Sequence, residues 1–235
     1  HKAIRRQRQM CIRDRANMGL WCARQVSTRY KDRADSIAKV SDLLAVMAAA
    51  QPGHYLAFFP SYSYLQQVWE NFTARYPDQP TLCQESSMDE GQRTEFLAQF
   101  LARDGKPLLG FAVLGGVFGE GVDLTGESLI GVAVVSPGLP QIGPRQEQLR
   151  DYFEETRGAG FDYAYRYPGM NKVLQAAGRV IRTPQDRGVV LLIDDRFLAP
   201  DTRRLMPPHW EHLRVVDSAD AWKDELAAFW KKHEP

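Results

Sequence analysis

The sequence has few of the features that mark secreted, metal-binding or membrane proteins. Its 235 residues include only three cysteines, which are widely spaced and form no CxxC pair. An odd number in this arrangement suggests neither a disulfide framework nor a zinc site. No apolar run approaches the roughly 20 residues that span a bilayer, and no secretory signal opens the chain. With 44% hydrophobic residues, we expect a soluble, cytoplasmic globular protein with no membrane partner.

Two common nucleotide-binding motifs are also missing. The glycine-rich segment GGVFGEGVDL at 115–124 has neither the GxGxxG spacing nor the GKS or GKT of a Walker A loop, so it cannot hold a triphosphate by itself. It does offer the carboxylates of Glu120 and Asp123 on a backbone that glycine makes permissive. These could accept hydrogen bonds from a ribose hydroxyl, an arginine or a lysine. Taken alone, the segment is better explained as a tight turn with capping acids.

Charge is unevenly distributed along the chain. Residues 1–15 hold six basic residues and one acidic residue, while the rest of the chain carries more acidic than basic residues. A basic tail could bind nucleic acid. The hexapeptide MCIRDR at 10–15, however, looks like one reading frame of a transposon-end adapter, and the residues before it show no apolar period. We therefore interpret residues 1 to about 15 as an artefact joined to a truncated gene, and expect 1–24 to be a tail and linker and 25–235 the domain.

Apolar residues beyond the tail alternate between two periodicities. Helical spacing covers residues 37–47, 65–72, 96–101, 145–156, 170–182 and 219–232, and short apolar runs that are typical of buried strands cover 55–59, 81–84, 108–114, 130–135 and 189–194. Strands that alternate with helices predict an α/β fold with a mainly parallel sheet and helices on both of its faces.

Four segments directly follow predicted strands, at 60–63, 84–87, 115–124 and 136–140. They are rich in hydroxyls, glycines and turn residues, which suit contacts to phosphate oxygens. Each segment alone is adequately explained as a turn. Because ligands bind beyond the carboxyl ends of strands in such sheets, the four together favour a binding edge. The acids Asp194 and Asp195 are adjacent in a predicted strand and would point to opposite faces, so we assign them to the end of that strand rather than to catalysis.

The segment QAAGRVIR at 175–182 places Arg179 and Arg182 on one side of an apolar helix, together with Gln175. No acidic residue lies within a helical turn of either arginine. Gly178 lies beside them, and a glycine inside a helix usually marks a close approach. Guanidinium forks suit phosphate best, so this pattern favours a polyanion ligand. The commoner fate of a lone RxxR is pairing with remote carboxylates on the surface.

Three segments in order carry a family resemblance. QAAGRVIR, followed by GVVLLIDDR, resembles motif VI and its following strand in the XPD/DinG-type DNA helicases of superfamily two. VFGEGVDLTGESL resembles the motif V region of that family, and LAFFPSYSYL resembles its motif IV region. TRYKDR at 28–33 also resembles the start of the second RecA-like lobe. The resemblance covers about residues 25–200 and implies a three-layer RecA-like domain.

The resemblance implies a motor in which ATP with Mg2+ lies between two lobes. Arg179 and Arg182 would be the catalytic residues, at least one of them an arginine finger. Nucleotide-side contacts would come from Gln175, Gly178, Glu120, Gly121 and Asp123. Ser61, Tyr62 and Ser63 would meet single-stranded DNA.

The family's first lobe is not recognisable in the sequence. A Walker A lysine and a DEAH-type motif are missing, and so are the four cysteines of an iron–sulfur cluster that the family commonly carries in that lobe. We therefore expect half a motor, inactive alone, whose partners are single-stranded DNA and an N-terminal helicase lobe. Two alternatives stay open. One is a stand-alone nucleotide-binding α/β module, which nucleotide titration would reveal, and the other is a decayed lobe that acts as a docking scaffold.

Overall fold

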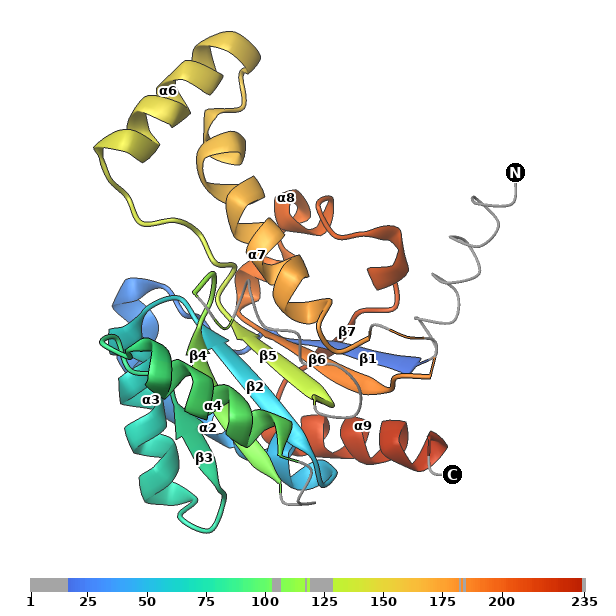
Figure 1. Ribbon diagram of the computed structural model, residues 1–235. Helices are drawn as coiled ribbons and strands as arrows, with labels where there is room; N and C mark the ends of the chain where they lie inside the picture. Colours follow the sequence, from blue (N-terminus) through green and yellow to red (C-terminus); the bar gives the residue numbers. More distant parts are fainter. Residues whose placement is uncertain are drawn as a thin grey trace.

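The computed structural model describes residues 17–102, 107–116, 118, 129–181, 183 and 185–233. Its described strands form one sheet in the order β3-β4-β2-β5-β6-β1-β7, and every pairing between neighbours is parallel. The strands are β1 Met18–Ala23, β2 His54–Phe59, β3 Thr81–Cys83, β4 Leu108–Val113, β5 Gly131–Val135, β6 Gly188–Ile193 and β7 Arg214–Val216. The predicted parallel sheet is confirmed (Figure 1).

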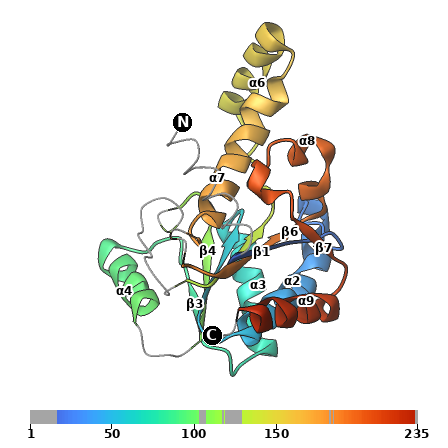
Figure 2. The same cartoon turned by 90° about the vertical axis from the view of Figure 1, so that its right-hand side faces the viewer.

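Helices cover both faces of this sheet. One face carries α2 (Arg33–Ala50), α3 (Tyr62–Arg75) and α9 (Ala219–Lys232), and the other carries α4 (Glu90–Leu101) and α7 (Tyr167–Ala177). Figures 1 and 2 show the three layers. The predicted α/β three-layer architecture is therefore confirmed.

Strand β2 shows why the buried strands read as continuous apolar runs. All six of its residues are buried. Tyr55 and Ala57 point into the core beneath α2 and α3, whereas Leu56 and Phe58 point into the core beneath α4 and α7. Because successive side chains alternate between two covered faces, neither set can be polar.

Strand β1 corrects the expected domain boundary. Met18–Ala23 lies within the segment expected to be a tail and linker, yet it is fully buried and pairs with β6 on one side and β7 on the other. The domain therefore begins before residue 25. Residues 1–16 lie outside the described residues, so the interpretation of residues 1 to about 15 stays a prediction.

A helical arm projects from the body of the domain. It comprises α6 (Pro144–Arg157), a π-helical turn (Asp162–Arg166) and the first part of α7 (Figure 1). No residue of α6 is buried. The arm is held together by aromatic contacts, among them Phe153 stacked on Tyr163 with ring centroids 4.2 Å apart.

The helix that carries QAAGRVIR is shorter than predicted. α7 ends at Ala177, and Gly178 is its C-cap at φ −64° and ψ −5° rather than a residue of the helix interior. A Cβ on Gly178 would lie 3.1 Å from the carbonyl oxygen of Leu174, so the neighbour that crowds this position is the preceding helical turn. Arg179 follows in a turn.

One of the remaining short helices precedes α2, and the other three lie between β6 and β7. They are η1 (Tyr30–Asp32), η3 (Asp195–Leu198), α8 (Pro200–Arg203) and η4 (Pro208–Trp210). No helix among the described residues is long and apolar enough to cross a membrane.

Candidate nucleotide and nucleic-acid surfaces

The described candidate residues fall into two groups at opposite edges of the sheet. Ser61, Tyr62 and Ser63 directly follow β2 and so lie at the carboxyl edge. Arg179 lies near the amino edge, because the neighbouring Val180 packs against Gly188, the first residue of β6. α7 connects the two edges, so the arginine surface and the hydroxyl surface are separate sites.

The arginine surface is built on the last turn of α7. Gln175 and Gly178 are exposed, and Arg179, four residues after Gln175, is half-buried. Gly178 also lines a cavity of about 290 Å³, whose other lining residues are Met18, Leu174, Ala177, Ile181, Pro207, His209 and Trp210. Four of the predicted site residues lie outside the described residues, namely Arg182, Glu120, Gly121 and Asp123. Their roles stay predictions.

The hydroxyl surface is ordered by helix capping and by a buried amide. Ser61 is the N-cap of α3, and its hydroxyl accepts a hydrogen bond from the backbone N–H of Tyr64 at 3.4 Å. Tyr62 is 37% exposed, and its hydroxyl accepts a hydrogen bond of 3.0 Å from the side-chain amide of the buried Gln84. Gln84 in turn accepts from the backbone N–H of Val113 at 2.8 Å. The ring of Tyr62 is therefore tethered to the end of β4 while part of it faces solvent.

Gln84 helps to order the hydroxyl surface, and the sequence alone does not reveal this role. The segment 84–87 is recognisable as one that follows a strand, but an isolated glutamine gives no sign that it will be 5% exposed and will link two strand ends.

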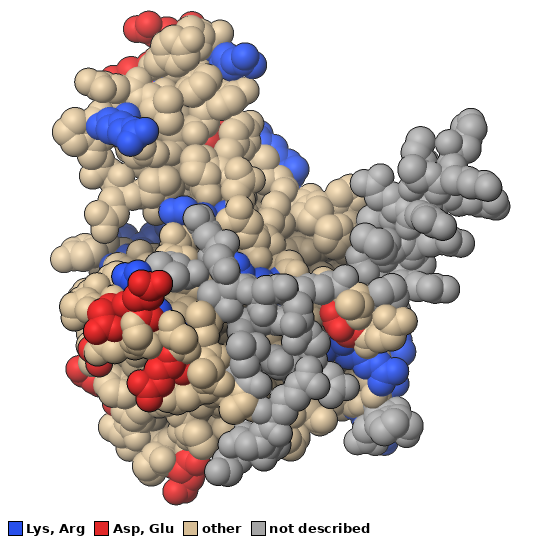
Figure 3. Space-filling model, in the orientation of Figure 1, with Lys and Arg blue, Asp and Glu red and all other residues tan. Residues whose placement is uncertain are grey.

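Charged side chains gather in several places on the face that Figure 3 shows. Figure 3 shows Lys and Arg side chains on the body just below the projecting arm, and a group of Asp and Glu side chains around α4. The basic region lies on the side of the carboxyl edge, from which the arm rises (Figures 1 and 3). This distribution favours an anionic ligand beneath the arm.

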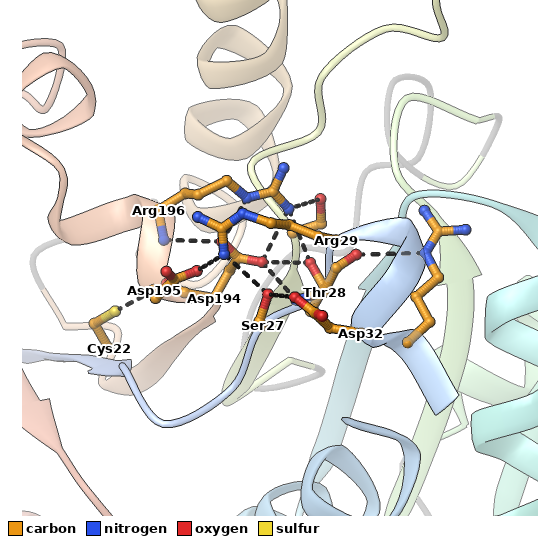
Figure 4. A network of polar contacts seen from close by, with 10 residues as sticks. Cys22, Ser27, Thr28, Arg29, Asp32, Asp194, Asp195 and Arg196 are labelled. Atoms are coloured by element: carbon orange, nitrogen blue, oxygen red, sulfur yellow. Dashed lines mark hydrogen bonds and ion pairs between the residues drawn. The ribbon is translucent and has the colours of Figure 1, made fainter. Parts of the chain in front are cut away.

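The carboxyl ends of β1, β5 and β6 are joined by a buried carboxylate. Asp194 is fully buried, and it accepts hydrogen bonds from the Thr28 N–H at 2.8 Å and the Thr28 hydroxyl at 2.5 Å. The Arg196 guanidinium donates to the same carboxylate at 2.7 and 2.9 Å, and it reaches the Ser136 hydroxyl at 3.4 Å (Figure 4). Burial raises the pKa of Asp194, but the hydrogen bonds and charge of Arg196 and the hydrogen bonds from Thr28 outweigh it, so this pKa lies below its usual value.

A second set of contacts holds the segment after β1 against the same strand end. Arg29 donates to the Asp195 carboxylate at 2.6 Å and to the Ser27 hydroxyl at 2.9 Å, and that hydroxyl donates to Asp32 at 2.6 Å (Figure 4). Asp194 and Asp195 thus do terminate β6, and each binds a different part of segment 27–32. These contacts order the short helix η1.

Metal ligands do not gather in the part of the chain that the structure describes. No group of three or more His, Cys, Asp or Glu side chains there could hold a metal ion.

The family model and the relatives that match this chain are named as helicases or helicase domains. A family model described as "Helicase C-terminal domain" matches residues 44–213. The Bos taurus protein named "Regulator of telomere elongation helicase 1" is 30% identical over 86% of this chain and 18% of its own length. The Schizosaccharomyces pombe protein named "General transcription and DNA repair factor IIH helicase subunit XPD" is 27% identical over 83% of this chain and 26% of its own length. This chain spans about a fifth to a quarter of these relatives.

Solved structures show the same fold. A structure titled "XPD_APO" superposes with a TM-score of 0.67 at 18% identity, over 86% of this chain and 40% of that one. The C-terminal domain of the DEAD-box protein Dbp5 superposes with a TM-score of 0.51 at 15% identity, over 92% of this chain and 98% of that one. The fold is the RecA-like fold of helicase lobes, as predicted.

Proposed function

We propose that this chain, which belongs to the helicase C-terminal domain family, is the second motor lobe of an ATP-dependent DNA helicase of the XPD/DinG type. The observation that carries the proposal is the extent of the family match. Residues 44–213 include both the hydroxyl surface after β2 and the arginine surface at the end of α7. Relatives over most of the chain are named as helicases.

The arginine surface would face ATP held mainly by a first lobe. The half-buried Arg179 has its backbone fixed by the turn after α7, and Gln175 is exposed one helical turn earlier. The Nε of Arg179 is buried, so the terminal N–H groups of the guanidinium are the donors that phosphate oxygens would meet. ATP would supply the phosphoryl group and the free energy of hydrolysis. The role of this chain is to complete the site with positive charge, from Arg179 and from Arg182.

The hydroxyl surface would carry single-stranded DNA. Ser61 and the exposed Ser63 place hydroxyls at the start of α3, and Tyr62 adds a tethered ring beside them. The N-terminus of a helix also favours anions, because its first backbone N–H groups have no partner within the helix. Phosphate contacts of this kind position a strand without reading its sequence.

Arginine substitutions in the longer helicase test whether the arginine surface acts on ATP and the hydroxyl surface on single-stranded DNA. We expect Arg179→Ala or Arg182→Ala to lower DNA-stimulated ATP turnover by on the order of a thousandfold, because an arginine finger stabilises charge that develops on the transferred phosphoryl group. Single-strand affinity, measured by fluorescence anisotropy, should stay within about twofold, because the two surfaces lie at opposite edges of the sheet. Arg24→Ala, at an exposed arginine paired with Asp217, is the control. Wild-type turnover in both variants would exclude the proposed role.

The isolated chain gives a second test. With no Walker A lysine in its sequence, we expect no DNA-stimulated ATPase activity above buffer but measurable binding of single-stranded DNA. Robust ATPase activity of the purified chain would contradict its assignment as the second lobe of a two-lobe site.

A further inference from the structure

Tyr30 is the most exposed large hydrophobic side chain among the described residues. It is 87% exposed, and it lies on η1, which follows β1 at the carboxyl edge of the sheet. A single exposed aromatic residue is common on protein surfaces and needs no explanation by itself. The surroundings of Tyr30 are what distinguish it.

The turn that carries Tyr30 is fixed on both sides. Thr28 is bonded through its backbone N–H and its hydroxyl to the buried Asp194, Arg29 is paired with Asp195, and Asp32 accepts from Ser27. None of the three residues of η1 is buried. The backbone is therefore held while the ring projects into solvent. A ring presented on an ordered turn loses little conformational entropy when a flat ligand stacks on it.

Arg33 links this ring to the hydroxyl surface. Its guanidinium carbon lies 5.6 Å from the ring centroid of Tyr30 and 5.1 Å from that of Tyr64, and Tyr64 lies in the first turn of α3 beside Ser61 and Ser63. Its Nε also donates to the carbonyl oxygen of Thr28 at 3.4 Å. Within the described residues Arg33 makes no ion pair with a carboxylate. A half-buried cation oriented by two rings and a carbonyl retains donors for an outside anion.

We propose that Tyr30 and Arg33 form a nucleotide-binding subsite, in which the Tyr30 ring stacks on a base of a single strand and Arg33 contacts the adjoining phosphate. The proposal rests on the proposed function, and it extends the hydroxyl surface from α3 across to η1. The combination of an exposed aromatic ring with a neighbouring guanidinium is the arrangement by which proteins bind single strands without reading sequence. The basic region beneath the arm in Figure 3 lies on the same side of the molecule.

Two oligonucleotides distinguish base stacking on Tyr30 from a phosphate contact to Arg33. One is a fluorescein-labelled oligothymidylate, and the other has the same length and backbone but abasic sugars. We expect Tyr30→Ala to weaken oligothymidylate binding by the isolated chain roughly five- to hundredfold, the range of one base stacked on one aromatic ring. Abasic binding should weaken much less, because Tyr64 and the Thr28 carbonyl oxygen still orient Arg33. Tyr30→Phe keeps the ring and should bind both like the wild type. Tyr152→Ala, which removes a 59% exposed ring from α6, is the matched control.

Arg33 should behave differently. Arg33→Ala should weaken both oligonucleotides equally and lower the slope of log affinity against log salt by about 0.7, the value for one phosphate contact on a single strand. If Tyr30→Ala matches Tyr152→Ala, or weakens both oligonucleotides alike, the stacking subsite is refuted while the proposed function stands. If the wild-type chain binds neither oligonucleotide, the single-strand track of the proposed function fails and the subsite fails with it.

Discussion

Removal of the Asp194 carboxylate should be among the most destabilising changes in the domain. Asp194→Ala would leave the Arg196 guanidinium, whose side chain is only 24% exposed, without its buried counter-charge. It would also leave the N–H and the hydroxyl of the buried Thr28 without an acceptor. Breaking a buried ion pair by removing one partner costs about 3–5 kcal/mol. For a domain of this size, about 2–4 °C of melting temperature per kcal/mol gives a loss of roughly 6–20 °C.

Urea unfolding followed by tryptophan fluorescence measures this loss. Asp217→Ala is the matched control, because it breaks the pair with Arg24 in which both side chains are 59% exposed, and exposed pairs contribute only about 0–1 kcal/mol. Asp194→Asn keeps the shape of the side chain but removes the charge, so it should fall between the two. If Asp194→Ala and Asp217→Ala lower the free energy of unfolding equally, the network in Figure 4 does not hold the strand ends together.

The same carboxylate predicts how stability depends on pH. The pKa of Asp194 is lower in the folded state than in the unfolded chain. Its contribution is therefore fully present above the unfolded value of about 3.9 and is lost as pH falls through the folded value. The wild-type protein should lose stability on acidification below about pH 4 more steeply than Asp194→Asn does. Parallel curves would show that Asp194 is not the group responsible.

Two further predictions concern the core. Gly131→Ala should lower the free energy of unfolding by about 1–3 kcal/mol, because a Cβ at this position in β5 would lie 2.5 Å from the buried ring of Tyr55. Gly143→Ala is the control and should lower it by less than about 1 kcal/mol, because nothing lies within 4 Å of the added atom. Equal urea midpoints for the two variants would contradict the packing of β5. Burial, and secondly the charge of Asp194, raises the pKa of the Cys22 thiol to about 12. Iodoacetamide at pH 8 should therefore leave Cys22 unmodified in the native protein and alkylate it in urea, which peptide mass spectrometry measures. Alkylation of the native protein at the unfolded rate would show that β1 is not part of the sheet.

The sheet was predictable from the sequence wherever a strand is an isolated apolar run. β2, β4, β5 and β6 are buried on both faces, and each fell within one residue of its predicted bounds. β1 was missed because its apolar residues follow directly on a basic segment without periodicity, so nothing marks where the strand begins. β7 was missed because it has three residues, of which two are exposed. Such a strand is defined by its pairing with β1 and not by its own hydrophobicity.

The placement of the candidate residues was predictable in part. Ser61, Tyr62 and Ser63 lie at the carboxyl edge, as expected for a segment that follows a parallel strand, whereas their role stays a prediction. The Asp194 network was not, since it joins residues 166 positions apart, and no local pattern specifies such a partner. The end of α7 was misplaced because Val180 and Ile181 continue the helical apolar period beyond it. In the structure Val180 lies in a turn and packs against the start of β6, so its side chain is buried without a further turn of helix.

The position of α7 bears on how the two candidate surfaces can influence each other. At its start, Gly169 lies so close to the loop after β5 that a Cβ there would approach the Pro137 carbonyl oxygen to 2.6 Å. Beyond its end, Val180 packs against Gly188 at the opposite edge of the sheet. A helix held by close packing at both ends cannot slide along the sheet without disturbing one contact or the other. A movement of α7 would therefore reach both Arg179 and the loop after β5, from which the chain enters the arm (Figure 1).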